Sequence, residues 1–376
     1  MLDHEKDTLP SVTPFDIDRL PDSFQRFLSM NGIDPTVYTI SNLPRYVRWN
    51  TQYDGTLPTL HDLRSQLDTD HVWAVPGREG VFGFMDNKRR LFDVPAYQAR
   101  ALFGMDLSSI IAVEALDVHP NDHIMDLCCA PGAKLCMLAN LVAPGKGTVT
   151  GVDIATHRLA TCRALLRKYN VGFNVRLFAA DGTTFGAHPP ARVGGDLVAP
   201  LHKEPSIMPY WAPKVLRHAQ QATTLYDKVL VDAECTHDGS IAHILKYEQW
   251  GWDAFEKNFM DPDRIDTIAE LQRNLLAQGW RMLKPGGVAV YSTCSLTIQQ
   301  NEDIIGWFLQ SHMDATLEPV PGMDLPPVAL APIKPSTCAT QEIQVLLNNH
   351  CLRFDPLVSR TSGFFVARLR KKKVCD

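Results

Sequence analysis

From about residue 106 onward, the chain alternates between short apolar runs and amphipathic segments. The apolar runs have the length of buried strands and cover residues 123–127, 147–153, 175–181, 228–232 and 287–292. Between them, apolar positions recur at helical spacing over residues 108–116, 133–142, 156–169, 265–283 and 302–310. This alternation predicts βαβ units, and therefore an α/β fold with a mostly parallel sheet and helices on both faces.

The pattern before residue 106 differs, and it divides the chain into three parts. Residues 1–20 have the character of an irregular leader, and residues 21–105 predict a small α/β module. The short elements of that module are predicted at residues 59–67, 72–76 and 80–84. The main domain then covers 106–376, with Pro-rich stretches at about 182–223 and 319–351 that are expected to be surface insertions.

Composition limits the class of protein. The 376 residues are 45% apolar and 21% charged, which is typical of a globular protein of about two domains. No apolar run reaches the roughly 18 residues of a membrane span, and the acidic start lacks a secretion or mitochondrial signal. Nine cysteines, an odd number, favour reduced thiols inside the cell. The nucleus or the cytoplasm is therefore predicted, with the mitochondrion left open.

Charge gives a mixed indication about partners. The net charge of −5 argues mildly against a dedicated nucleic-acid binder. Basic residues nevertheless cluster at 88–90 and at 368–373. Each cluster is compatible with a solvated surface or loose tail, and also with contacts to phosphates.

The first segment that carries chemistry is DLCCAPGAK, at residues 126–134, where a predicted strand turns into a helix. The carboxyl end of a parallel strand is where open α/β sheets bind ligands, and small residues let the backbone approach a ligand closely. The phosphate-binding P-loop and the dinucleotide fingerprint are both absent from the segment. It therefore predicts a ligand loop of another kind, with an ordinary βα turn as the alternative.

Two acidic residues close the next two predicted strands. Asp153 stands where nucleotide sites grasp a ribose, and Asp181 is placed to bind an adenine amino group. Either residue could instead cap a helix or a turn. Taken with the loop at 126–134, they favour a ligand that contains adenosine.

Cys235 and Cys294 follow the last two predicted strands, on the edge where the ligand should lie. A lone cysteine after a strand is usually a packing residue, but two beside polar residues indicate reactive thiols. Zinc would need these two with Cys128, Cys129 and His237, and the spacing typical of zinc sites is absent. The sequence thus predicts no metal site.

These motifs resemble those of the Nol/Nop/Sun (RsmB-like) family of S-adenosylmethionine-dependent RNA cytosine-C5 methyltransferases. The resemblance covers roughly residues 40–182, 226–310 and 352–370. CCAPGAK at 128–134 is similar to the cofactor loop CAAPGGK, and YSTCS at 291–295 with NE at 301–302 matches the nucleophile motif. Residues 43–50 resemble the amino-terminal module, KPGG at 284–287 fits the turn before the nucleophile strand, and SGFFVA at 362–367 fits the closing strand.

The resemblance implies a class I (Rossmann-like) methyltransferase fold behind an RNA-contacting module. It implies that Cys294 attacks carbon 6 of cytosine and that Cys235 releases the product. Protonation of the ring nitrogen would make carbon 6 more electrophilic, and Asp232 is the candidate carboxylate that stabilises the resulting cation. Residues expected at the cofactor S-adenosylmethionine are Cys128, Cys129, Ala130, Pro131, Gly132, Ala133, Lys134, Asp153, Arg158, Asp181 and Asp232.

The expected partner is a structured RNA whose target cytosine lies in a loop or is flipped out, with tRNA favoured over rRNA. We expect no membrane partner and a monomer.

One position departs from the family's motif. The family writes this loop as DAPCSG, whereas residue 234 here is a glutamate in place of proline. A carboxylate beside Cys235 is expected to raise the pKa of that thiol, which puts the efficiency of Cys235 in doubt. The alternative function is therefore an RNA-binding or assembly protein that keeps the fold without activity. A DNA cytosine methyltransferase is disfavoured, because the Pro-Cys loop and the ENV motif of those enzymes are absent.

Overall fold

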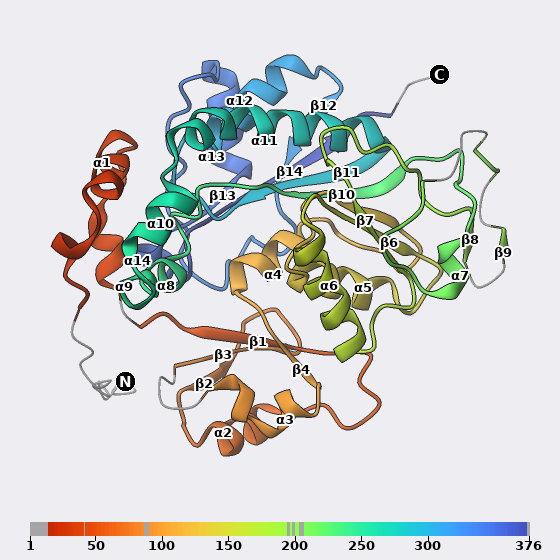
Figure 1. Cartoon of the computed structure of the whole chain (residues 1–376), viewed down its shortest axis with the longest axis horizontal. Helices are drawn as coiled ribbons and strands as arrows, with labels where there is room; N and C mark the ends of the chain where they lie inside the picture. The colour runs from red at the N-terminus through yellow and green to blue at the C-terminus, as the bar shows by residue number, and fades with distance from the viewer. Residues whose placement is uncertain are drawn as a thin grey trace.

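A computed structural model describes residues 14–40, 42–85, 90–193, 196–197, 200–202 and 207–373 (Figure 1). Most of the expected leader, and Lys88 and Arg89 of the first basic cluster, lie outside these described residues. No helix in the described part of the chain is both long and apolar enough to cross a membrane.

The main domain is built on a sheet in the order β12-β14-β11-β10-β5-β6-β7, with β13 paired to β14. Its strands are β5 (His123–Asp126), β6 (Thr148–Asp153), β7 (Val175–Ala179), β10 (Tyr226–Asp232), β11 (Leu283–Thr293), β12 (Ala315–Glu318), β13 (Leu352–Phe354) and β14 (Phe364–Lys371). The five strands from β7 to β11 are parallel, and β14 is antiparallel to β11. The strand order reverses between β5 and β10, and open α/β sheets bind ligands at such a point.

Helices cover both faces of this sheet (Figure 1). One face packs on α4 (Leu107–Glu114), α5 (Ala133–Val142) and α6 (Thr156–Lys168), and the other on α11 (Pro262–Met282), α12 (Glu302–Ser311) and α13 (Gln341–His350). Successive strand residues point to opposite faces. Ile124 therefore enters the first core and Met125 the second. The predicted mostly parallel sheet with helices on both faces is confirmed.

A second sheet, in the order β2-β3-β1-β4, precedes the main domain. It comprises β1 (Arg45–Trp49), β2 (Val72–Ala74), β3 (Val81–Phe84) and β4 (Leu102–Gly104), with α2 (Leu60–Leu67), η3 (Leu91–Asp93) and α3 (Pro95–Gln98) beside it. Arg48 fixes this sheet to α5, because its Nη1 donates to Asn140 Oδ1 at 2.9 Å. Burial lowers the pKa of Arg48 to about 10. Arg48 is thus a buried docking residue, and an RNA-contacting role for the module over 21–105 stays a prediction.

The first described helices do not pack on that sheet. η1 (Ile17–Arg19), α1 (Asp22–Met30) and η2 (Pro35–Thr39) share an apolar core with α8 (Ile241–Ile244), α9 (Tyr247–Trp250) and α10 (Trp252–Phe259). Tyr38 Oη donates to the carbonyl of Asp238 at 2.7 Å. The amino-terminal segment therefore supports the chain that follows β10.

The two Pro-rich stretches contain more order than the sequence indicated. The first includes β8 (Arg192–Val193), β9 (Asp196–Leu197) and α7 (Lys214–Arg217). The second includes α13, which Leu347 anchors in the core, and is followed by α14 (Pro356–Ser359).

The basic stretch at 368–373 is largely strand and not a loose tail. Arg368 is buried and bonded to Glu318 at 3.1 Å, and Arg370 reaches the same carboxylate at 2.5 Å. Lys371 Nζ donates to the carbonyls of Trp280 and Leu283 at 2.8 and 3.0 Å. Most of these cations are engaged within the protein, so the stretch gives little support to phosphate contacts.

Candidate active site

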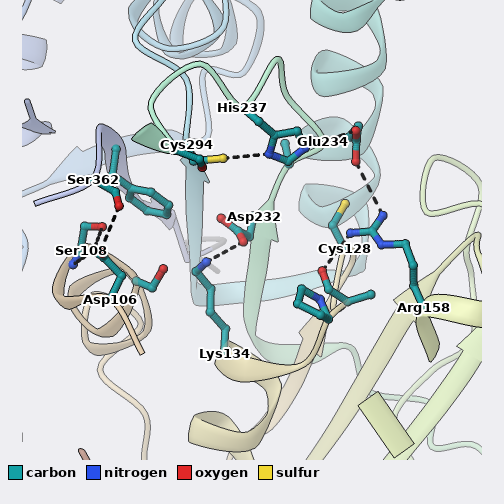
Figure 2. A pocket seen from close by; sticks show the side chains of 16 residues that line it. Asp106, Ser108, Cys128, Lys134, Arg158, Asp232, Glu234, His237, Cys294 and Ser362 are labelled. Atoms are coloured by element: carbon teal, nitrogen blue, oxygen red, sulfur yellow. Dashed lines mark hydrogen bonds and ion pairs between the residues drawn. The ribbon is translucent and has the colours of Figure 1, made fainter. Parts of the chain in front are cut away.

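Two neighbouring cavities open beside the carboxyl ends of the parallel strands. The first has a volume of about 270 Å³ and includes Lys134, Asp232 and Cys294 in its wall (Figure 2). The second, of about 350 Å³, is lined by residues that include Asp153 and Asp181. Three residues line both cavities, namely Cys128, Arg158 and Glu234. A ligand in the second cavity would therefore adjoin a ligand in the first.

The loop between β5 and α5 forms the boundary between these cavities. Gly132, at φ 111°, begins the turn into α5, and a Cβ there would lie 3.1 Å from the Cα of Cys162. Cys129 donates its amide to the carbonyl of Val152 at 3.0 Å and buries its side chain. Among the predicted cofactor residues, Cys129, Gly132 and Ala133 line neither cavity, and their assignment stays a prediction.

Asp153 is buried, and its carboxylate is largely engaged in contacts within the protein. Its carboxylate accepts from the amides of Ala155 at 2.9 Å and Ala130 at 3.3 Å. Arg158 lies 3.6 Å from the same carboxylate and donates to the carbonyl of Ala130 at 3.0 Å. Both functions considered for Asp153 are thus compatible with the structure, because it stabilises the turn and also lines the second cavity.

Asp181 is exposed at the wall of the second cavity. Its Oδ1 accepts from the amide and the hydroxyl of Thr183, at 2.8 and 2.7 Å. The turn-capping alternative for Asp181 is therefore seen directly. Its position in the cavity wall also keeps it available for a ligand.

Asp232, at the end of β10, is held from two sides. Lys134 Nζ lies 2.6 Å from Oδ2, and Ser292 Oγ donates to Oδ1 at 2.7 Å. Burial acts to lower the pKa of Lys134, but Asp232 outweighs it and raises that pKa above its usual value. The pair therefore carries an ammonium and a carboxylate beside the cavity (Figure 2).

Cys235 and Cys294 meet because β10 and β11 are adjacent and parallel. Their Sγ atoms are 3.3 Å apart. The backbone amide of Gly239 connects the two loops by donating to the carbonyl of Cys294 at 2.8 Å. A Cβ at residue 239 would lie 2.6 Å from that carbonyl oxygen. The two predicted thiols are thus brought into contact.

The Asn-Glu pair of the nucleophile motif supports the Cys294 loop from behind. Asn301 bonds both Thr293 Oγ1, at 2.5 Å, and the carbonyl of Ser295, at 2.8 Å. Glu302 forms a fully buried ion pair with Arg353 at 2.5 Å, and Arg353 donates to the carbonyl of Leu296 at 3.0 Å. These residues position the loop and do not line the cavity.

Sequence reasoning did not assign a catalytic role to His237, which the structure places against Cys294. Its Nδ1 lies 3.0 Å from Cys294 Sγ, and its Nε2 lies 3.6 Å from Glu234 Oε1 (Figure 2). A signal was available, because His237 stands where the motif DAPCSG has its glycine. His237 also adopts φ 58°, a conformation that favours glycine.

The two thiols differ in their ionisation. Hydrogen bonding from Cys235 and the nearby His237 lower the pKa of Cys294 well below its usual value, against the effect of burial. Burial, followed by Cys294, raises the pKa of Cys235 well above its usual value. The expected rise at Cys235 is therefore present, but its cause is not Glu234. That carboxylate points to Arg264, at 2.7 Å, and to His237.

Donor atoms of Cys235, His237 and Cys294 all lie within 4.8 Å of one another. Structural zinc sites usually have four protein ligands, and this group offers three. The absence of a metal stays a prediction.

The sheet order and the position of the cavities define a class I methyltransferase. A family model described as "16S rRNA methyltransferase RsmB/F" matches residues 113–197 and 211–370. The chain belongs to this family, as the resemblance to Nol/Nop/Sun proteins predicted.

Curated relatives named ribosomal RNA small subunit methyltransferase F agree with this assignment. The protein of Shewanella amazonensis is 28% identical over 262 residues, which cover 68% of this chain and 42% of the relative. The protein of Serratia proteamaculans is 27% identical over 289 residues, with coverages of 76% and 48%. The chain thus spans less than half the length of these relatives.

Solved structures support the fold. A methyltransferase homolog protein from Pyrococcus horikoshii has a TM-score of 0.63 and 25% identity, covering 94% of this chain and all of that one. NSun6 from the same organism, described with SFG, has a TM-score of 0.66 at 17% identity, with coverages of 96% and 100%. The second likeness concerns the fold alone.

Proposed function

We propose that the protein transfers a methyl group from S-adenosylmethionine to carbon 5 of a cytosine in RNA, through a covalent adduct on Cys294. The observation that carries this proposal is the contact of two thiols at the sheet edge. Cys294 lines the first cavity beside Asp232, and Cys235 touches it from behind at 3.3 Å. The family to which the chain belongs supports methyl transfer to RNA.

The residues of the second cavity suit an adenosine-containing cofactor. Asp181 offers an exposed carboxylate, and Leu271 and Leu275 offer apolar surface to a base. Asp153 and Arg158 would hold the ribose end, next to the shared wall at Cys128. When bound, S-adenosylmethionine supplies an electrophilic methyl group. The cavity in which cytosine would bind begins on the other side of that wall.

Carbon 5 of cytosine needs activation before it can accept a methyl group. Cys294 supplies it by covalent catalysis, in which the sulfur adds to carbon 6 and turns the ring into an enamine. The lowered pKa of Cys294 favours the thiolate that this addition needs. Carbon 5 then becomes nucleophilic.

Asp232 is placed to stabilise the protonated ring nitrogen that accompanies this addition. A carboxylate held in advance costs no reorganisation at the moment of reaction. Lys134 and Ser292 provide that fixation, at 2.6 and 2.7 Å.

After transfer, the carbon-5 proton leaves and the bond between carbon 6 and sulfur breaks. Cys235 is the proposed release group because its sulfur lies beside that of Cys294. The other thiols of the site are less suited to this step. Cys129 is buried away from both cavities, and Cys128 lies at the wall toward the cofactor.

The RNA is the least defined partner. The names of the relatives place small-subunit rRNA first among the candidates, ahead of the tRNA that the sequence favoured. A cytosine must leave its stack to enter the first cavity, which costs least in a loop or bulge. A monomer is the simplest state for this proposal, because Cys235, Cys294 and Asp232 all come from one chain.

The test is methyl transfer from labelled S-adenosylmethionine to two separate substrates, small-subunit rRNA and total tRNA, with nucleoside analysis of the products. The proposal predicts label in 5-methylcytidine from one of the two. Label in another nucleoside would contradict it. Cofactor binding without any transfer would support the non-catalytic RNA-binding alternative.

A further inference from the structure

The two positions at which this chain departs from the DAPCSG motif most strongly, Glu234 and His237, contact each other and reach Cys294. The imidazole bridges the carboxylate and the thiol through its two nitrogens, at 3.6 and 3.0 Å (Figure 2). A carboxylate, an imidazole and a thiol in this order form the arrangement that activates a nucleophile through an oriented base.

The carboxylate of this Glu234–His237–Cys294 row is itself held in place. Arg264, from α11, lies 2.7 Å from Glu234 Oε1, and Arg158, from α6, lies 3.7 Å from Oε2. Gln272 donates to the backbone carbonyl of Glu234 at 2.8 Å, and Arg264 also holds the carbonyl of Cys235 at 2.6 Å. Helices from both faces of the sheet therefore hold Glu234 where it can orient the imidazole.

The imidazole is also held in place. The His237 ring meets the edge of Phe259 with centroids 5.5 Å apart. The backbone of His237 is left-handed at φ 58°, a conformation that is costly for a residue with a side chain. The chain adopts this unfavourable backbone at the loop position that presents an imidazole to Cys294.

We propose that His237 is a catalytic base that holds Cys294 as a thiolate, and that Glu234 is a positioning residue for that base. This inference rests on the proposed function for the identity of the reaction. It adds to that function an activating pair placed at two positions where the DAPCSG motif has proline and glycine.

The proton and electron balance is closed. The proton of the Cys294 thiol moves to His237 Nδ1, and the freed sulfur electron pair forms the bond to carbon 6. The electron pair displaced in the cytosine ring moves to the ring nitrogen, which takes a proton from water. Cys294 is then no longer an anion, so the neighbouring Cys235 passes its thiol proton to water. Carbon 5 takes the methyl group and loses its own proton to the Cys235 thiolate, the ring nitrogen returns its proton to water, and the imidazolium keeps the proton taken from Cys294. When the bond between carbon 6 and sulfur breaks, the electron pair returns to sulfur, facing the imidazolium again.

The ionisation of the three groups agrees with this geometry. Burial acts to lower the pKa of His237, but Cys294 and then Glu234 outweigh it and raise that pKa to about 10. Burial acts to raise the pKa of Glu234, but His237 and Arg264 lower it to about 2. The imidazolium and both anions therefore coexist at neutral pH.

Other charged or titratable groups also face the Glu234–His237–Cys294 row, and they come from the helices and loops packed against it. They are Arg158, Arg264, Lys134, Asp232, Asp238, His243 and Cys235. Cys235 is the important competitor, because its hydrogen bond also lowers the pKa of Cys294. The experiment must therefore separate His237 from Cys235.

The test measures the rate at which iodoacetamide alkylates Cys294 between pH 6 and 8. The reaction contains a metal chelator and no RNA, and mass spectrometry identifies the modified cysteine. His237→Asn tolerates the left-handed backbone and keeps a polar group without a base of similar pKa. His237→Gly restores the motif's residue and relieves the backbone. His243→Asn is the matched control, because the described contacts include no hydrogen bond between His243 and Cys294.

The wild type and His243→Asn should be alkylated at rates that change less than about twofold across this range, since a thiolate is already present. In His237→Asn and His237→Gly the rate should rise about tenfold per pH unit, as for an ordinary thiol. Flat profiles in both His237 variants would overturn the proposal. The lowered pKa of Cys294 would then be due to its hydrogen bond with Cys235.

The same variants separate this inference from the proposed function. If both His237 variants lose the flat profile while the wild type methylates no RNA, the activating pair stands and the reaction is wrong. If the wild type makes 5-methylcytidine and the His237 variants keep both the rate and the flat profile, the reaction stands and the pair is wrong.

Discussion

Cys235 and Cys294 offer a comparison within one site, because they follow neighbouring parallel strands and touch at 3.3 Å. Cys294 lines the cavity and contacts an imidazole at 3.0 Å, whereas Cys235 is 1% exposed and lies behind it. The pKa of Cys294 is lowered and that of Cys235 is raised. Their surroundings thus shift the pKa values of two identical side chains in opposite directions. This difference is the physical basis for giving the two thiols different roles.

The loops that carry the two thiols are also anchored differently. The Cys294 loop rests on a buried ion pair between Glu302 and Arg353. The Cys235 loop is held through backbone carbonyls by Arg264 and Gln272. The first anchor is a fully buried charge pair, and the second consists of hydrogen bonds to the backbone of the loop.

Replacing Cys294 by alanine should lower methyl transfer by at least about a thousandfold, since the proposed adduct forms on the sulfur of Cys294. Cofactor affinity should stay within about twofold, because Cys294 does not line the second cavity. Labelled methyl transfer and equilibrium binding measure the two effects. Retained transfer would remove Cys294 as the nucleophile.

Replacing Arg353 by alanine should cost about 3–5 kcal/mol of unfolding free energy, because Glu302 would be left buried and unpaired. Arg370→Ala is the matched control. Arg370 is about 40% exposed and pairs with Glu318, so its loss should cost no more than about 1 kcal/mol. Urea unfolding compares the two. Equal costs would mean that burial does not distinguish these ion pairs.

Replacing Cys235 by alanine should lower turnover by about a hundredfold while the first addition continues. The enzyme should then accumulate an RNA adduct that survives denaturation and is seen as a shifted band on a gel. Cys128→Ala serves as the control at the neighbouring wall and should not accumulate adduct. An absence of adduct from Cys235→Ala would assign release to another group.

Replacing Glu234 by glutamine should have the smallest effect, about threefold to tenfold on kcat/KM near neutral pH. The sign of its pH dependence follows from the imidazolium. Without the carboxylate the pKa of His237 falls from about 10 toward 6.5, so the imidazole is a weaker base for the Cys294 thiol. The loss relative to wild type should be larger at pH 6, where an ordinary thiol keeps its proton, than at pH 9, where an ordinary thiol ionises without a base. A loss that grows toward high pH would contradict this account.

Sequence periodicity located most of the main sheet because strands and helices there are long enough to show a pattern. Helix α5 occupies the predicted residues, and α6, β7 and β11 differ from prediction only at their ends. Helices α8 and α9 were missed, because four residues cannot display a helical period. Their positions depend on the aromatic core that they share with α1.

The candidate site was predictable where a motif fixes a residue at a strand end. Asp232, Cys235 and Cys294 meet because the register of two adjacent strands brings them together. The contact of Glu234 with His237 depends on a left-handed residue and on Arg264, which lies 30 positions away. Neither feature leaves a local pattern. For this reason the prediction that Glu234 raises the pKa of Cys235 was wrong about the cause, which is burial followed by Cys294.

The most direct test of the central claim is covalent trapping on RNA transcribed with 5-fluorocytidine, in the presence of S-adenosylmethionine. Fluorine at carbon 5 cannot leave as a proton does, so the enzyme should stop at the methylated adduct. The account predicts a cofactor-dependent adduct that maps to Cys294 by peptide mass spectrometry. An adduct on Cys235, or none on an RNA that the wild type methylates, would contradict it.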